Sequence, residues 1–243
     1  MNKDNQSIDL IYAEKWKTSS KLFEEKGYYK WMSSRVKAYN RILEIGCGSG
    51  NSTLALANDG HEVLVVEKNH ECTLMAQKLL QDSGYGDKVS FLEGDIILPE
   101  FRNSVIKNND VDVVICWNPG TQLDTDSLTY YTKYMIEYGL TAEQIKRNPS
   151  PSYCELILWH ACDIAKSMNK PIHIIDRTTD IDEELVNYYN LLGNKTGYSY
   201  VQFDLLEAET ISDGGVQLVS NGVLQNNYKM PIVLLSILFL KEK

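Results

Sequence analysis

Three glycines at alternate positions, Gly46, Gly48 and Gly50, directly follow a short apolar run. Glycine has no Cβ, so these residues allow a tight backbone turn and a close approach to a bound molecule. The next segment, Asn51–Asn58, has the pattern of a helix. A strand, a glycine loop and a helix N-terminus in this order are typical of sites that hold nucleotides. The spacing therefore predicts a nucleotide-type binding corner.

Glu67 lies at the position where a nucleotide-binding fold of this type places a carboxylate. His61–Glu67 contains a continuous apolar run at 63–66, which predicts a strand buried on both faces, and Glu67 ends it about 20 residues after the first glycine. In dinucleotide-type folds, an acid at this place accepts hydrogen bonds from ribose hydroxyls. A solvated acid at a strand end is the alternative, but the glycine loop upstream favours the binding role.

The glycine spacing does not fit a nicotinamide dinucleotide, because that fingerprint has its third glycine where this chain has Asn51. The string EIGCGSG at 44–50 instead closely resembles the first motif of class I S-adenosylmethionine-dependent methyltransferases. An NAD-dependent oxidoreductase is accordingly disfavoured.

The resemblance continues to about residue 119. Lys88–Glu93 predicts a third strand, which Gly94, Asp95 and Ile96 follow. In the family, the acid at this place bonds the adenine amino group and the next apolar residue packs on the ring. Val111–Cys116 predicts a fourth strand.

The resemblance also implies which residues hold S-adenosylmethionine. Glu44 and the glycine loop would serve the methionine portion, Glu67 the ribose, and Asp95 with Ile96 the adenine. The full set expected to bind the cofactor is Glu44, Gly46, Cys47, Gly48, Gly50, Glu67, Lys68, Asp95, Ile96 and Trp117.

The second half continues the alternation of helix and strand. The patterns predict helices at Tyr153–Met168 and Asp180–Leu192, and strands at Pro171–Asp176, Tyr198–Leu206 and Pro231–Leu240. The fold class expected is α/β, a Rossmann-like, doubly wound sheet of seven strands. The resemblance implies the strand order 3-2-1-4-5-7-6, with the last strand antiparallel and helices on both faces.

Three segments exceed this core, and we expect them to select the substrate. Residues 1–39 are predicted to form a helical lid on a single domain at 40–243, which carries insertions at 120–152 and 209–230. The first insertion contains Tyr130, Tyr134 and Tyr138 at helical spacing, which indicates either a lid or a packed face. Turn signals in the second insertion predict a small protruding hairpin.

Methyl transfer is an in-line displacement that depends mainly on positioning, although a hydroxyl acceptor also needs a base. Asn118, Asp176 and Tyr29 are the candidates to orient an acceptor, because the loops that carry them converge at the carboxyl edge of the sheet. Amino-methylating family members carry an Asn/Asp-Pro-Pro-aromatic box after the fourth strand. Gly120 replaces its second proline here, so we favour a turn near the methyl group at Asn118 and Pro119 over the alternative, a box that recognises an amide or a base.

Composition limits the partners. The 243 residues carry a net charge of −9 and no long basic run, so a nucleic-acid partner is not expected. The five cysteines include no CxxC pair, and the N-terminus lacks an apolar signal core. These features predict a cytoplasmic protein without a metal site. The longest apolar run, Ile232–Leu240, is too short for a membrane helix.

The sequence thus predicts a class I methyltransferase acting on a small molecule or a protein side chain. A non-catalytic cofactor-binding subunit and an aminopropyl-transfer enzyme of the same fold are the alternatives. We expect a small-molecule partner and no membrane, with a homodimer as an open alternative to a monomer.

Overall fold

The structure is a computed structural model that describes residues 8–119, 123, 125–213, 216–217, 219–220, 223–224 and 229–241. Within these residues, one sheet of seven strands has the order β3-β2-β1-β4-β5-β11-β6. Its strands are β1 (Arg41–Ile45), β2 (Glu62–Glu67), β3 (Val89–Glu93), β4 (Val113–Trp117), β5 (Ile172–Thr178), β6 (Tyr200–Thr210) and β11 (Met230–Leu240).

Strands β1 to β5 pair in parallel, and β11 runs antiparallel to both of its neighbours, β5 and β6. The predicted fold class and strand order are therefore confirmed. The central strand β4 is buried along its whole length, as its continuous apolar sequence requires.

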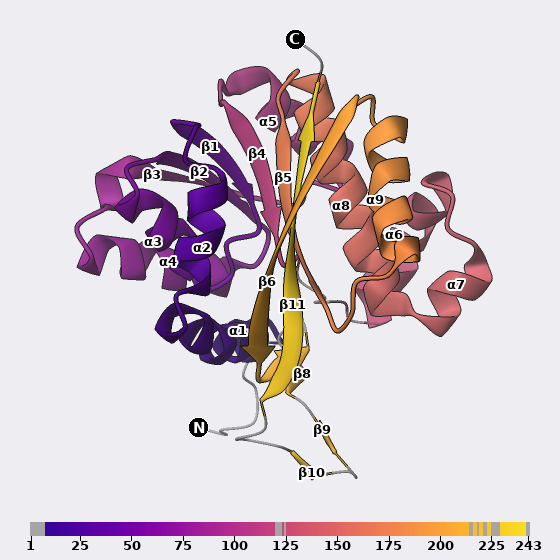
Figure 1. The fold of residues 1–243 in the computed structure, drawn as a ribbon, viewed down its shortest axis with the longest axis horizontal. Helices are drawn as coiled ribbons and strands as arrows, with labels where there is room; N and C mark the ends of the chain where they lie inside the picture. Colours follow the sequence, from indigo (N-terminus) through magenta and orange to yellow (C-terminus); the bar gives the residue numbers. More distant parts are fainter. Residues whose placement is uncertain are drawn as a thin grey trace.

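Helices cover both faces of the sheet (Figure 1). Apolar side chains of α2, α3 and α4 pack on one face, and those of α5, α8 and α9 pack on the other. The helices are α1 (Ile8–Glu25), α2 (Tyr28–Arg35), α3 (Asn51–Asn58), α4 (His70–Asp82), α5 (Pro99–Asn108), α6 (Thr125–Glu137), α7 (Ala142–Arg147), α8 (Pro149–Ser167) and α9 (Glu183–Lys195), with a 3-10 turn at Gly86–Lys88.

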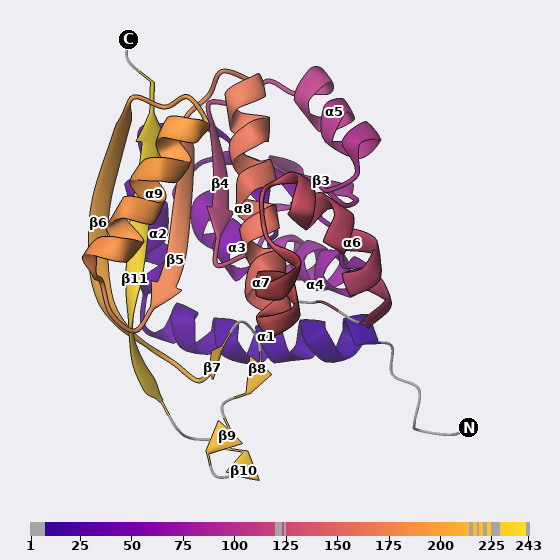
Figure 2. The ribbon, with the colours of Figure 1, turned by 90° about the vertical axis from the view of Figure 1, so that its right-hand side faces the viewer.

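Helix α1 runs across the end of the sheet at which β5 finishes (Figure 2). That end is the carboxyl edge of the parallel strands, where α/β folds place their ligands. The predicted lid segment 1–39 thus includes two helices, α1 and α2, and the first of these crosses the expected site.

The predicted starts of two helices are wrong. Helix α8 begins at Pro149, four residues before the predicted start, because proline suits the first turn of a helix. Helix α9 begins at Glu183, since the Asp182 side chain accepts a hydrogen bond from the amide of Leu185 at 2.8 Å and caps it there.

The two insertions agree with expectation only in part. Tyr134 and Tyr138 of the predicted tyrosine stripe pack against a buried cluster that includes Tyr131 and Met135, whereas Tyr130 is 44% exposed. After β6, the chain forms two small antiparallel pairs in place of one hairpin: β7 (Ser212–Asp213) with β8 (Val216–Gln217), and β9 (Val219–Ser220) with β10 (Val223–Leu224). The turn residues themselves lie outside the described residues.

None of the helices in the described part of the chain combines the length and the apolar character that a membrane span requires.

Gly50 joins the glycine loop to the helices beneath it. Its φ is 88°, and a Cβ at this position would lie 2.7 Å from the Cα of Ala76 in α4. Both the backbone conformation and the contact with α4 therefore require glycine. Packing, rather than ligand contact, explains this residue.

We predict that Gly50→Ala destabilises the protein by about 3 kcal/mol, from the strain of a positive φ added to the clash with Ala76. Gly60→Ala is the matched control, because Gly60 has a φ of 96° but no atom within 4 Å of its Cβ position. The control should cost only about 1–2 kcal/mol. Urea denaturation measures both losses, and equal losses would contradict the packing role of Gly50.

Candidate active site

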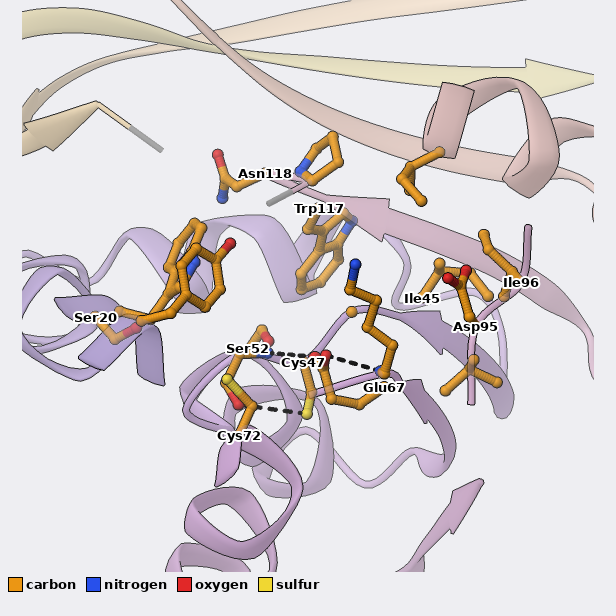
Figure 3. A pocket seen from close by; sticks show the side chains of 18 of the residues that line it. Ser20, Ile45, Cys47, Ser52, Glu67, Cys72, Asp95, Ile96, Trp117 and Asn118 are labelled. Atoms are coloured by element: carbon orange, nitrogen blue, oxygen red, sulfur yellow. Dashed lines mark hydrogen bonds between the residues drawn. The ribbon is translucent and has the colours of Figure 1, made fainter. Parts of the chain in front are cut away.

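A single pocket brings most of the predicted residues together at the carboxyl edge of the sheet (Figure 3). It contains about 880 Å³ of empty space, including the part open to solvent. The predicted residues that line it are Tyr29, Gly46, Cys47, Gly48, Glu67, Lys68, Asp95, Ile96, Trp117 and Asn118. Glu44, Gly50 and Asp176 are not among the lining residues.

Glu67 fixes the glycine loop against the end of β2. One carboxylate oxygen accepts the amide of Gly48 at 3.2 Å, and the other accepts the amides of Lys68 and Asn69, each at 2.9 Å. Burial raises the pKa of Glu67, although these three hydrogen bonds act in the opposite direction. The side chain therefore has two functions open to it, shaping the loop and accepting bonds from a ligand.

Glu44 lies behind the loop and is completely buried. Its carboxylate accepts hydrogen bonds from the hydroxyls of Ser52 at 2.5 Å and Thr53 at 2.6 Å, in the first turn of α3. Both oxygens are thus occupied by the protein itself. Glu44 could therefore affect the methionine portion of a cofactor only indirectly, by holding the loop and the helix in place.

Asp95 also lines the pocket, and each of its two carboxylate oxygens accepts a hydrogen bond from the protein. One oxygen accepts the amide of Ile97 at 2.9 Å, and the other accepts the hydroxyl of Tyr131 from α6. The insertion at 120–152 thus touches the acid that was predicted to bind adenine.

Lys68 is another residue that lines the pocket. Its ammonium donates to the hydroxyl of Tyr153 at 2.7 Å and lies 4.7 Å from the centre of that ring. The ring of Tyr131 is 5.1 Å away, so the cation is flanked by two aromatic faces. Burial raises the pKa of the Tyr153 phenol well above its usual value, which keeps it neutral.

An aromatic wall from the N-terminal helices faces the glycine loop. Tyr12, Trp16 and Ser20 of α1 line the pocket, together with Tyr29 of α2. The ring of Trp16 lies 3.9 Å from the Cβ position of Gly48. Tyr29 donates its hydroxyl to Ser20 at 3.1 Å, and burial raises its pKa to about 12, so the phenol stays protonated at neutral pH.

Sequence reasoning did not assign Tyr12, Trp16 and Ser20 to the site, although their spacing of four residues places them on one face of a helix. It also missed Tyr153 and Ile157, which carry no motif. Their location in the pocket depends on how α8 packs against the sheet.

Trp117 and Asn118 form the wall next to β5. Asn118 has a φ of 48°, a left-handed conformation that asparagine tolerates better than most residues, and its amide bonds the carbonyl of Ile175 at 2.8 Å. Among the described residues, none bonds its buried side-chain oxygen. A buried oxygen without a partner is costly, so stability alone does not explain Asn118.

Asp176 is directed elsewhere. Its carboxylate accepts the hydroxyl of Tyr189 at 2.7 Å and the amide of Arg177 at 2.8 Å. Burial raises its pKa. The structure therefore does not bring Asp176 together with Asn118 and Tyr29, because its carboxylate bonds Tyr189 of α9.

The described residues include no group of three or more histidine, cysteine, aspartate or glutamate side chains arranged to hold a metal ion.

Comparisons with known proteins agree with this arrangement. Residues 42–135 match a family model described as "Methyltransferase domain". These residues, together with the order of the seven strands, form a methyltransferase domain of the class I, S-adenosylmethionine-dependent type.

Curated relatives match only the central part of the chain. A probable cobalt-precorrin-6B C(15)-methyltransferase (decarboxylating) of Methanothermobacter thermautotrophicus is 33% identical over 81 residues, which are 33% of this chain and 40% of that protein. A 23S rRNA (uracil(1939)-C(5))-methyltransferase of Shewanella sediminis is 42% identical over 66 residues, which are 27% of this chain and 14% of that protein. The chain thus spans less than half the length of these relatives.

Solved structures resemble the fold over most of the chain. A putative RNA methyltransferase from Pyrococcus horikoshii matches with a TM-score of 0.52 and 13% identity, over 89% of this chain and 82% of that one. An O-methyltransferase family protein from Burkholderia thailandensis also has a TM-score of 0.52, with 10% identity over 91% of this chain and 57% of that one. At these identities the likeness concerns the fold of the methyltransferase domain.

The buried Glu44 predicts a pH dependence of stability. Burial raises its pKa from 4.5 to about 7. The folded protein therefore binds this proton more tightly than the unfolded chain, so the contribution of Glu44 to stability falls as pH rises from about 4.5 to about 7. Above that range the penalty is complete.

We expect Glu44→Gln to remove this dependence, because glutamine does not titrate. Melting temperatures of the two proteins, measured from pH 4.5 to pH 7.5, should converge at the acidic end and separate toward neutral pH in favour of the variant. Glu62→Gln, which changes an exposed acid at the start of β2, serves as the control. Parallel curves for wild type and Glu44→Gln would show that folding does not raise the pKa of Glu44.

Proposed function

We propose that this chain binds S-adenosylmethionine in the pocket and transfers its methyl group to a small-molecule acceptor. One observation carries the proposal: a single pocket has the glycine loop, Glu67 and Asp95 on one side and a wall of neutral, mostly aromatic residues on the other. The first side suits a nucleoside with a polar tail, and the second suits an acceptor.

The residues present fit the cofactor. No atom of the protein lies within 4 Å of a Cβ built on Gly46, so the backbone leaves room for a ligand at the loop. Glu67 retains acceptor capacity for ribose hydroxyls, because a carboxylate has about four lone-pair sites and three are used by backbone amides. Asp95 and Ile96 would contact the adenine.

When bound, S-adenosylmethionine supplies a methyl group on a positively charged sulfur. The task of the protein is to place the acceptor in line with that methyl and to exclude water. Trp16, Tyr29 and Trp117 provide apolar surface for this purpose, and Asn118 provides an amide to orient a polar group of the acceptor.

On the acceptor side of the pocket, the residues that the structure describes are poorly suited to remove a proton from an acceptor. Tyr29 keeps its proton at neutral pH, and the Trp117 indole N–H is bonded to His173. This arrangement favours an acceptor that reacts through a lone pair it already has, such as a neutral amine, over a hydroxyl that must first lose a proton.

A small acceptor agrees with a pocket covered by α1 and with the net charge of −9. The curated relatives include enzymes named for precorrin and for ribosomal RNA, so RNA is the competing acceptor class. Methyl transfer to a metabolite panel, measured beside transfer to structured RNA, tests the choice. Turnover on RNA alone would overturn the small-molecule proposal, and cofactor binding without turnover on either would favour a non-catalytic subunit.

We expect Glu67→Ala to weaken S-adenosylmethionine binding at least tenfold in calorimetry, because the ribose loses its acceptor and the loop loses three bonds. Glu93→Ala is a matched control, since Glu93 ends the neighbouring strand β3 in register with Glu67 but lies outside the pocket. It should change affinity less than about twofold. Unchanged affinity in Glu67→Ala would remove this residue from the site.

For Asn118 we expect loss of turnover with cofactor affinity retained. Asn118→Gly keeps the positive φ without strain but removes the amide, so it should lower kcat at least about tenfold. S-adenosylhomocysteine affinity should stay within about threefold of wild type. If Asn118→Gly turns over normally, the amide does not orient the acceptor.

A further inference from the structure

Three polar side chains form a chain of hydrogen bonds across the interior of the sheet. The indole Nε1 of Trp117 in β4 lies 2.8 Å from Nδ1 of His173 in β5, and Nε2 of His173 lies 2.8 Å from Oγ of Ser236 in β11. The strands are adjacent in the order β4-β5-β11, and both Trp117 and Ser236 are in register with Ile175, two residues along β5 from His173, so the bonds cross the three strands diagonally.

The direction of both bonds follows from the chemistry of the groups. An indole N–H can only donate, so Nδ1 of His173 is the acceptor and the imidazole carries its proton on Nε2. That proton is donated to the hydroxyl of Ser236. Burial lowers the pKa of His173 to about 3, so the ring remains neutral across the physiological range.

The strand neighbours of His173 are apolar. His173 is fully buried, and its partners in the strand register, Ile115 in β4 and Leu238 in β11, are both apolar. An apolar side chain at position 173 would match the surrounding core. A histidine there is favourable only if both of its nitrogens are satisfied, as they are.

Trp117 is the one member of the three that reaches the pocket. Its ring meets that of His173 edge to face, with the planes at 87° and the centres 5.7 Å apart. The following residue, Asn118, is held to the same strand through its amide and the carbonyl of Ile175. Strand β5 therefore holds this wall of the pocket by a side-chain bond and a backbone bond.

We propose that His173, although it does not line the pocket, is a positioning residue that fixes the orientation of the Trp117 ring. Its bond draws the indole N–H toward β5 and leaves the apolar ring facing the ligand. Without it, the N–H would be a buried donor in need of a partner, and the ring would turn to satisfy it. The effect on ligand affinity rests on the proposed function, whereas the orientation of the ring does not.

The first test follows the indole N–H by NMR in the ligand-free protein labelled with ¹⁵N-tryptophan, with the resonance assigned through Trp117→Phe. The N–H should be shifted downfield and protected from solvent exchange. In His173→Leu it should lose both properties, and in His173→Asn, whose side-chain oxygen can replace Nδ1, it should keep them. Rapid exchange of this N–H in the wild-type protein would overturn the proposal without need of any variant.

The second test measures binding of S-adenosylhomocysteine. His173→Leu should weaken it at least about fivefold, since a displaced wall misplaces the ligand, while His173→Asn and Ser236→Ala stay within about twofold of wild type. His160→Leu is the matched control for loss of a buried histidine, because His160 bonds Tyr138 at 3.0 Å and lies outside the pocket.

The outcomes separate the two proposals. Equal affinities for His173→Leu and His160→Leu would show that His173 serves stability alone. If the wild-type protein binds no S-adenosylhomocysteine, the proposed function fails, and the NMR measurement still decides the role of His173.

Discussion

The glycine loop is held between two buried carboxylates, and the site depends on this constraint. Glu44 secures the helix that follows the loop through the hydroxyls of Ser52 and Thr53, and Glu67 secures the loop itself through the amide of Gly48. Each acid loses solvation on burial, and hydrogen bonds from the protein replace part of it. The backbone between them is thereby shaped before any ligand arrives.

The part of the fold that could be predicted from sequence is the part governed by local pattern. Continuous apolar runs such as Val113–Trp117 mark strands covered on both faces, and their alternation with helices predicts a doubly wound sheet. Loop glycines and strand-end acids likewise have local reasons for their positions. Gly48, Glu67 and Asp95 therefore reach one pocket as predicted.

Long-range packing could not be predicted in this way. The placement of Tyr12 and Trp16 depends on α1 crossing the carboxyl edge of the sheet, which no local pattern specifies. The same limit applies to Asp176, whose position at a strand end indicates the pocket, but whose carboxylate is taken by Tyr189 of α9. For Glu44, the motif correctly places the residue beside the loop. It does not reveal that both carboxylate oxygens accept hydrogen bonds from Ser52 and Thr53.

Tyr131 reaches Asp95 from a helix that lies in the connection between β4 and β5. Its hydroxyl and the exocyclic amine of an adenine would be donors to one and the same carboxylate. If the adenine binds at Asp95 as proposed, docking of helix α6 and binding of the nucleoside are thermodynamically linked. The linkage is reciprocal: the nucleoside changes the docking equilibrium of α6 by the same factor by which docking of α6 changes the affinity for the nucleoside. Variation in this connection among related chains would then retune cofactor affinity without changing a single residue of the glycine loop.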